Sequence, residues 1–243
     1  MNNIRNRSWP LLFLVCMMWT ATNDAKAAEI LVNEISRNAP EDNVAGSFAC
    51  PVLKRCDHRV VGLFRPAGDS RKAWVVRAVP NEDSCHACTS KMTLLEYRKT
   101  ANGWKRVRSY SDFTEWGTWG KVRPQWVSLA RLKDGRILLL MRVPDVHFGV
   151  VTDVLSVYVT NGDSIARAGI FSTQYDTEGY GDGAPLVQWQ AAYGLRERNG
   201  RVMLEFHIHD RSGGKNTSSR FILVGNRFEA DGETDKRLSV SSQ

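Results

Sequence analysis

The sequence predicts an all-β protein, either an antiparallel β-sandwich or a partly open barrel, with a small propeller as the alternative and disulfides supporting the fold. Dipeptides that favour the positive backbone angles of tight hairpins recur along the chain, at Asn102-Gly103, Asp134-Gly135, Asn161-Gly162 and Asn199-Gly200. The runs between them are rich in valine, isoleucine, leucine and aromatic residues. A long amphipathic helix is not suggested by the periodicity. Together these features favour a series of antiparallel strands.

The strand-like runs follow one another at the spacing typical of all-β domains. They cover residues 74–78, 93–98, 105–110, 126–132, 136–143, 150–160, 164–171, 188–198, 201–210 and 219–224. In the run 201–209, Val202, Leu204, Phe206 and Ile208 alternate with polar residues, which predicts a half-buried strand. The run 136–141 is almost continuously apolar and predicts a central strand that is covered on both faces.

Residues 1–27 have the pattern of a cleavable signal peptide, which predicts a periplasmic or secreted protein. Arg5 and Arg7 precede an apolar run from residue 11 to 19, and Ala25-Lys26-Ala27 offers small residues for cleavage. The apolar run is too short to span a bilayer as a helix, and we expect no transmembrane segment after processing.

The rest of the chain divides into three parts by composition. We expect residues 28–48 to form an irregular lead-in, residues 49–229 a single all-β domain, and the charged, serine-rich residues 230–243 a flexible tail. The formal net charge of the whole chain is +7, with the basic residues spread along the chain. This distribution and the lack of a recognition motif argue against nucleic acid as a partner.

The cysteines that remain after processing are Cys50, Cys56, Cys85 and Cys88. An even number in an exported chain favours disulfides, and short loops favour Cys50 with Cys56 and Cys85 with Cys88, although other pairings stay open. The Cys85-His86-Ala87-Cys88 segment also permits a thiol-disulfide redox site. The hairpin predicted after Cys88 differs from the long helix that usually lowers a thiol pKa, so a structural clasp is favoured. Zinc binding is a weaker alternative.

Two other clusters could hold a metal ion. His207 and His209 lie on the same face of one predicted strand beside Glu205, which is the spacing of a two-histidine site on a sheet. The glycine-rich loop with Asp176, Glu178 and Asp182 offers oxygen ligands for calcium, but without the regular spacing of a calcium loop. Ordinary surface residues and an ordinary connection are the favoured interpretations, and we expect no cofactor.

Large aromatic residues gather at Trp116, Trp119 and Trp126, next to glycines. Exposed tryptophans could bind a protein or stack on a glycan, whereas buried ones would fill the core. The two interpretations are evenly balanced from the sequence.

The segment from residue 74 to 104 carries a weak, local resemblance to a known group of proteins. Its Cys-His-Ala-Cys motif precedes the hairpin Glu-Tyr-Arg-Lys-Thr-Ala-Asn-Gly-Trp. This arrangement resembles exported bacterial β-rich proteins of unknown function that share a CHxC segment. The resemblance implies an exported β-rich fold and carries no activity with it.

The functional expectation is a non-catalytic exported binding protein. The sequence has no Gly-x-Ser-x-Gly elbow, His-Glu-x-x-His motif or phosphate loop. We expect the partner to be another envelope protein or a delivered protein, with an inhibitor of a cell-envelope hydrolase or an immunity protein as the favoured type. A redox protein that uses Cys85 and Cys88, and a metal- or glycan-binding module, are the alternatives.

Overall fold

The computed structural model describes residues 18–19, 59–65, 70–80, 88–118, 122–179 and 186–239. Within these ranges the chain is an all-β protein with two antiparallel sheets, consistent with the predicted sandwich and without a closed barrel. The described part contains no helix long and apolar enough to cross a membrane. The two sheets confirm the predicted all-β fold class, and its support by disulfides remains a prediction.

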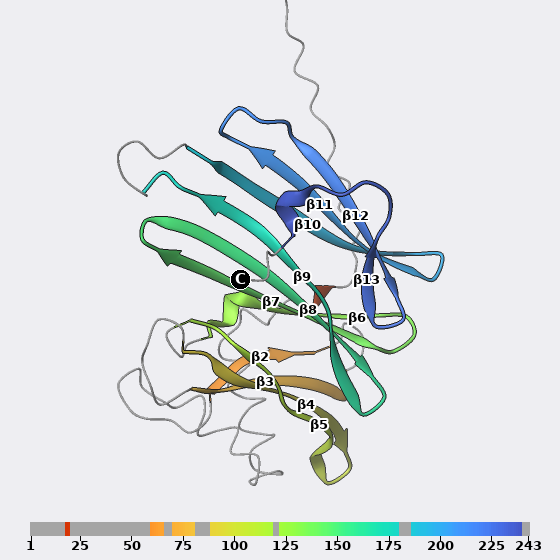
Figure 1. The fold of residues 1–243 in the computed structure, drawn as a ribbon. Coiled ribbons are helices and arrows are strands. Elements are labelled where there is room, and N and C mark those ends of the chain that lie inside the picture. Colours follow the sequence, from red (N-terminus) through yellow and green to blue (C-terminus); the bar gives the residue numbers. More distant parts are fainter. Residues whose placement is uncertain are drawn as a thin grey trace, which may run out of the picture.

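The smaller sheet has the order β2-β3-β4-β5 and the larger has the order β1-β6-β7-β8-β9-β10-β11-β12-β13. From β6 onwards each strand follows its neighbour in the chain, so the larger sheet is a long meander (Figure 1). The strands of the smaller sheet are β2 (Arg59–Phe64), β3 (Lys72–Pro80), β4 (Ser90–Thr100) and β5 (Gly103–Trp116). Those of the larger sheet are β1 (Met18–Trp19), β6 (Val127–Arg131), β7 (Ile137–His147), β8 (Val150–Asn161), β9 (Ser164–Asp176), β10 (Gln188–Arg198), β11 (Arg201–Asp210), β12 (Thr217–Val224) and β13 (Arg227–Ala230).

One hydrophobic core lies between the two sheets. Trp74, Met92 and Leu94 of the smaller sheet pack with Leu129 and Leu139 of the larger one. Figure 1 shows the smaller sheet against the half of the larger sheet that contains β6–β8, and this contact forms the sandwich. The opposite face of the smaller sheet has a buried cluster of its own, which includes Leu95 and Tyr97.

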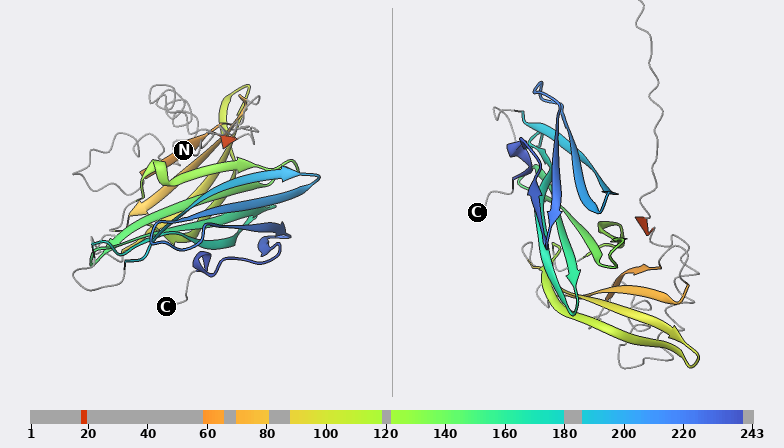
Figure 2. Two further views of the ribbon diagram at one scale, coloured as in Figure 1. Left: turned by 90° about the horizontal axis from the view of Figure 1, so that it is seen from above. Right: turned by 90° about the vertical axis from the view of Figure 1, so that its right-hand side faces the viewer.

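A second core lies on the other face of the larger sheet, which bends back on itself. Strands β9 and β10 pair through only three residue pairs, from Gln188 to Gln190, and then diverge. Figure 2 shows the resulting curvature from the side. Phe171 of β9 contacts the rings of Phe206, Phe221 and Phe228 on β11, β12 and β13, with ring centroids 4.9, 4.8 and 6.5 Å away. The β10–β13 half therefore covers the β6–β9 half.

Strand β7 joins the two cores because it is buried on both faces. Leu138 and Leu140 belong to the core enclosed by the larger sheet, whereas Ile137, Leu139 and Met141 belong to the core between the sheets. The continuously apolar run 136–141 thus forms the central strand that the sequence predicts.

The C-terminal segment packs on the larger sheet. Within the segment for which the sequence predicts a flexible tail, residue 230 ends β13, and a short 3₁₀ helix, η3 (Lys236–Leu238), follows. Leu238 is 2% exposed and joins the core of the larger sheet. Flexibility itself remains a prediction, but the part up to residue 239 has defined contacts.

Candidate functional site

The predicted tryptophan cluster is partly integrated into the fold. Trp116 is half-buried against the core between the sheets, with its indole nitrogen buried. Trp126 is half-buried in the 3₁₀ helix η2 (Pro124–Trp126), with the Arg123 guanidinium 5.4 Å from its ring centroid. Trp119 lies outside the described residues. The two described rings offer less free surface than exposed tryptophans would, and their binding role remains a prediction.

Among the cysteines, Cys88 is described; it is 7% exposed and lies two residues before the start of β4. Cys50, Cys56 and Cys85 lie outside the described residues. The pairing of the cysteines and the redox and zinc alternatives therefore remain predictions.

The histidine pair lies where the alternation predicts, on the solvent side of β11. His207 and His209 are exposed, while Val202, Leu204, Phe206 and Ile208 are buried. His207 Nδ1 hydrogen-bonds to Ser218 Oγ at 2.9 Å, and His209 Nδ1 to Asn216 Oδ1 at 3.2 Å. The Glu205 carboxylate forms ion pairs with Arg196 Nε at 3.1 Å and with Arg220 Nε at 3.2 Å. Within the described ranges no group of three or more potential ligands is gathered for a metal ion.

The predicted calcium loop is only partly described. Asp176 and Glu178 share one donor, because the Gln188 side-chain amide donates to a carboxylate oxygen of each at 3.0 Å. Asp182 lies outside the described residues. Calcium binding there remains untested.

The tip of the β7–β8 hairpin is a candidate site that no sequence pattern indicated. Phe148 and Gly149 form its two-residue turn, with φ values of +49° and +80°. Phe148 is 80% exposed. Within the described residues, the one aromatic ring that contacts its ring is that of His147, in an edge-to-face arrangement with a centroid distance of 4.1 Å. A large aromatic residue therefore occupies a strained backbone position without being buried.

A second turn in the same sheet shows what this geometry normally requires. Asn199 and Gly200 join β10 to β11 with φ values of +51° and +73°, close to those of Phe148 and Gly149. Asparagine-glycine is the preferred pair for a turn in which both central residues have positive φ. The sequence prediction relied on such dipeptides, which is why a phenylalanine-glycine turn escaped it.

Other exposed apolar residues lie at the same end of the sheet. Val146 is 61% exposed, Tyr175 36% and Leu186 53%. The register aligns Val146 with Val151 and Val151 with Asp176, the neighbour of Tyr175. The Thr177 amide donates to the carbonyl of Val187, which follows Leu186. We call Val146, Phe148, Tyr175 and Leu186 the apolar tip.

The start of the glycine-rich loop packs against the β7–β8 turn. A Cβ atom on Gly179 would lie 2.8 Å from the carbonyl oxygen of Gly149, closer than real side chains approach. Glycine at position 179 thus allows the two backbones to touch. This contact gives part of the glycine-rich segment a structural role beside the turn.

A buried ion pair lies on the same hairpin. Arg142 of β7 pairs with Asp153 of β8, which is 1% exposed, whereas 40% of the Arg142 side chain is exposed. The hydrogen bond to Asp153 raises the pKa of Arg142, and burial raises the pKa of nearby Tyr193 on β10. Every second residue of a strand projects from the same face, and Arg142, Pro144 and Val146 therefore share one face of β7. The fixed guanidinium of Arg142 thus lies on the same side of the strand as Val146 of the apolar tip.

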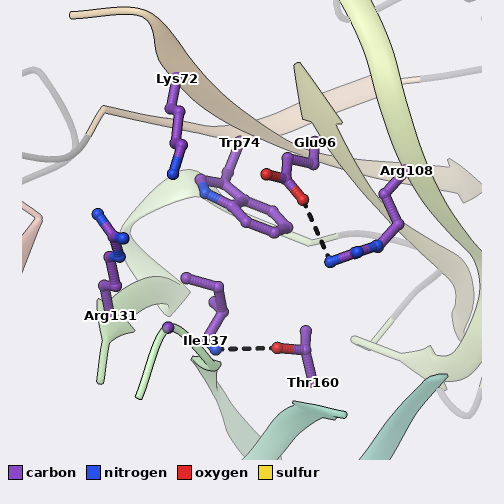
Figure 3. Close-up of a pocket in the computed structure, with 8 residues that line it drawn as sticks. Lys72, Trp74, Glu96, Arg108, Arg131, Ile137 and Thr160 are labelled. Carbon is purple, nitrogen blue, oxygen red and sulfur yellow. Dashed lines mark hydrogen bonds and ion pairs between the residues drawn. The ribbon is translucent and has the colours of Figure 1, made fainter. Parts of the chain in front are cut away.

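A separate small cavity lies between the two sheets (Figure 3). Its volume is about 60 Å³, and it is lined by Lys72, Trp74, Glu96, Arg108, Arg131, Gly135, Ile137 and Thr160. Arg108 Nη1 lies 3.5 Å from Glu96 Oε2, and its Nε lies 3.1 Å from Asp163. The Ile137 amide donates to the Thr160 hydroxyl at 2.9 Å. Three basic side chains and one carboxylate line the cavity.

Comparisons of the chain with protein-family models, with curated proteins and with solved structures gave no match, so the following proposals rest on the sequence and the geometry of the described residues.

Proposed function

We propose that this chain is a non-catalytic exported binding protein that inserts its apolar tip into a partner protein. The observation that carries the proposal is Phe148, which is 80% exposed at a φ of +49°. The favoured partner is a cell-envelope hydrolase or a delivered toxin, which the protein would inhibit or neutralise.

The argument for function begins with the cost of Phe148 to the fold. A residue other than glycine in the left-handed region costs on the order of 1–3 kcal/mol, and asparagine tolerates this region better than phenylalanine. Burial of the ring would offset that cost, but 80% of Phe148 is exposed. Since folding gains little from this side chain, binding is the simplest reason for it.

The surroundings of Phe148 suit a protein interface. Interfaces concentrate their binding energy in a few aromatic and arginine residues, surrounded by apolar contacts that exclude water. The apolar tip offers an aromatic residue at an exposed hairpin turn, and Arg142 on the same hairpin is held in place by buried Asp153. An exposed ring at a hairpin turn can enter a concave surface such as the cleft of a hydrolase.

The test compares two surface variants in binding and in stability. Phe148→Asn should remove the ring and relieve the turn, while Val224→Asn changes another exposed apolar residue, 52% exposed, next to the β12–β13 turn. Proteins retained from envelope extract by the wild type and by Val224→Asn, but lost with Phe148→Asn, would be purified and their affinities measured.

We expect Phe148→Asn to weaken binding at least tenfold and to raise the free energy of unfolding by about 1 kcal/mol in urea titration. The opposite changes in affinity and stability distinguish a binding residue from a structural one. Retention of the same proteins by Phe148→Asn and the wild type would refute the proposal, as would a large loss of stability in Phe148→Asn.

A further inference from the structure

We propose that the cavity between the two sheets binds a small anion through a carboxylate or phosphate group. This site is independent of the apolar tip, because it is built from other strands and lies between the sheets. Its basic residues Lys72 and Arg131 would hold the anion.

The strand register builds one wall of the cavity from the smaller sheet. Trp74 of β3 is paired with Glu96 of β4, and Glu96 is paired with Arg108 of β5. Cross-strand partners project to the same face, so these three side chains form a row. Lys72 lies two residues before Trp74 and therefore points to the same side.

The larger sheet supplies the opposite wall. Ile137 begins β7, and Thr160 lies near the end of β8, joined by the hydrogen bond from the Ile137 amide to the Thr160 hydroxyl. The Thr160 hydroxyl is therefore held by contacts within the protein, with the Tyr110 hydroxyl as a further hydrogen-bond neighbour. Arg131 comes from the end of β6.

The arrangement of charges defines where an anion would lie. Figure 3 shows the Lys72 amine and the Arg131 guanidinium on the same side of the cavity, beside the indole of Trp74. Glu96 lies toward the other side, next to Arg108. Among the described residues Arg131 has no carboxylate within ion-pair distance. An anion beside Arg131 would supply the counter-charge for this guanidinium, and the positive charge of Lys72 nearby would attract the same anion.

Glu96 restricts the type of ligand. It is 6% exposed, and its carboxylate lines the cavity, so it repels a second negative group and can accept a hydrogen bond from a hydroxyl or amine. A volume of about 60 Å³ accommodates a few water molecules or one small group, and not a polymer. The structure thus favours a compact anion such as a hydroxycarboxylate or phosphate.

Two matched variants test the site in the protein purified from expressing cells. Arg131→Gln removes a charge from the cavity, whereas Lys133→Gln removes a charge from the adjacent exposed turn, outside the lining. Lactate and inorganic phosphate would be titrated at constant ionic strength, with binding followed by calorimetry and by the chemical shift of the Ile137 amide.

We expect saturable binding of lactate or phosphate to the wild type, with a shift of the Ile137 amide. Arg131→Gln should weaken it at least tenfold, and Lys133→Gln should leave it within twofold of the wild type. Binding of lactate alone would identify a hydroxycarboxylate, and binding of phosphate alone a phosphate. Lack of saturation at tens of millimolar, or equal weakening by both variants, would overturn the proposal.

Discussion

Asp235 illustrates how a single residue fastens the C-terminal segment to the larger sheet. Its carboxylate accepts hydrogen bonds from the Arg237 amide at 2.9 Å, from Arg237 Nε at 3.0 Å and from the Thr217 hydroxyl at 2.5 Å. Arg237 also pairs with Asp210 at 2.5 Å. These contacts orient η3 so that Leu238 enters the core.

The Asp235 contacts predict a loss of stability in acid. The hydrogen bonds from Arg237 hold the pKa of Asp235 well below its usual range. Because the folded pKa lies below the unfolded value of about 3.9, the contribution is complete above that value and is lost as the pH falls toward the folded pKa. After allowance for solvent screening it is on the order of 1 kcal/mol.

Urea titrations at pH 7 and pH 3 measure this effect. We expect Asp235→Asn to reduce the difference between the free energies of unfolding at pH 7 and at pH 3. Asp231→Asn is the control: Asp231 forms an exposed ion pair with Arg220, and its removal should change this difference little. An unchanged difference in Asp235→Asn would contradict the assignment.

At the level of elements, the β7–β8 hairpin shows what the sequence could and could not predict. Alternation and apolar runs located both strands, but the prediction ended the first at residue 143, whereas β7 continues to His147. The polar and proline-containing end of β7 lacks a clear period. Strand β2 was also missed, because Gly62 interrupts a short apolar run. The positive φ of Phe148 could not be predicted either, because it depends on the turn that the two paired strands impose.

The ion pair on this hairpin predicts unequal effects of removing its two partners. Arg142→Met leaves the Asp153 carboxylate, 1% exposed, buried without its cation, and should cost about 3 kcal/mol of stability. Asp153→Asn leaves Arg142, which is 40% exposed and can be hydrated, and should cost less. Urea unfolding at pH 7 measures both, and an equal or reversed order would contradict the explanation.

At the level of the whole molecule, β7 makes the two cores interdependent. The sequence predicted a central strand at residues 136–141, but it could not show that alternate residues serve different cores, because that requires the larger sheet to bend back at β9 and β10. Leu139 and Leu140 are neighbours in the chain and face opposite cores. A substitution that loosens the packing of either core therefore affects the backbone of β7, which both cores share.

This arrangement predicts that the described sandwich unfolds as one cooperative unit. Leu139→Ala and Leu140→Ala should each reduce the free energy of unfolding by about 2–5 kcal/mol, since both side chains are almost completely buried. Hydrogen–deuterium exchange should then show equal losses of protection in β4, which contributes to the core between the sheets but not to the core of the larger sheet, and in β11, which contributes only to the core of the larger sheet. If Leu140→Ala lowers protection in β11 and leaves β4 unchanged, the two cores unfold independently and β7 does not couple them.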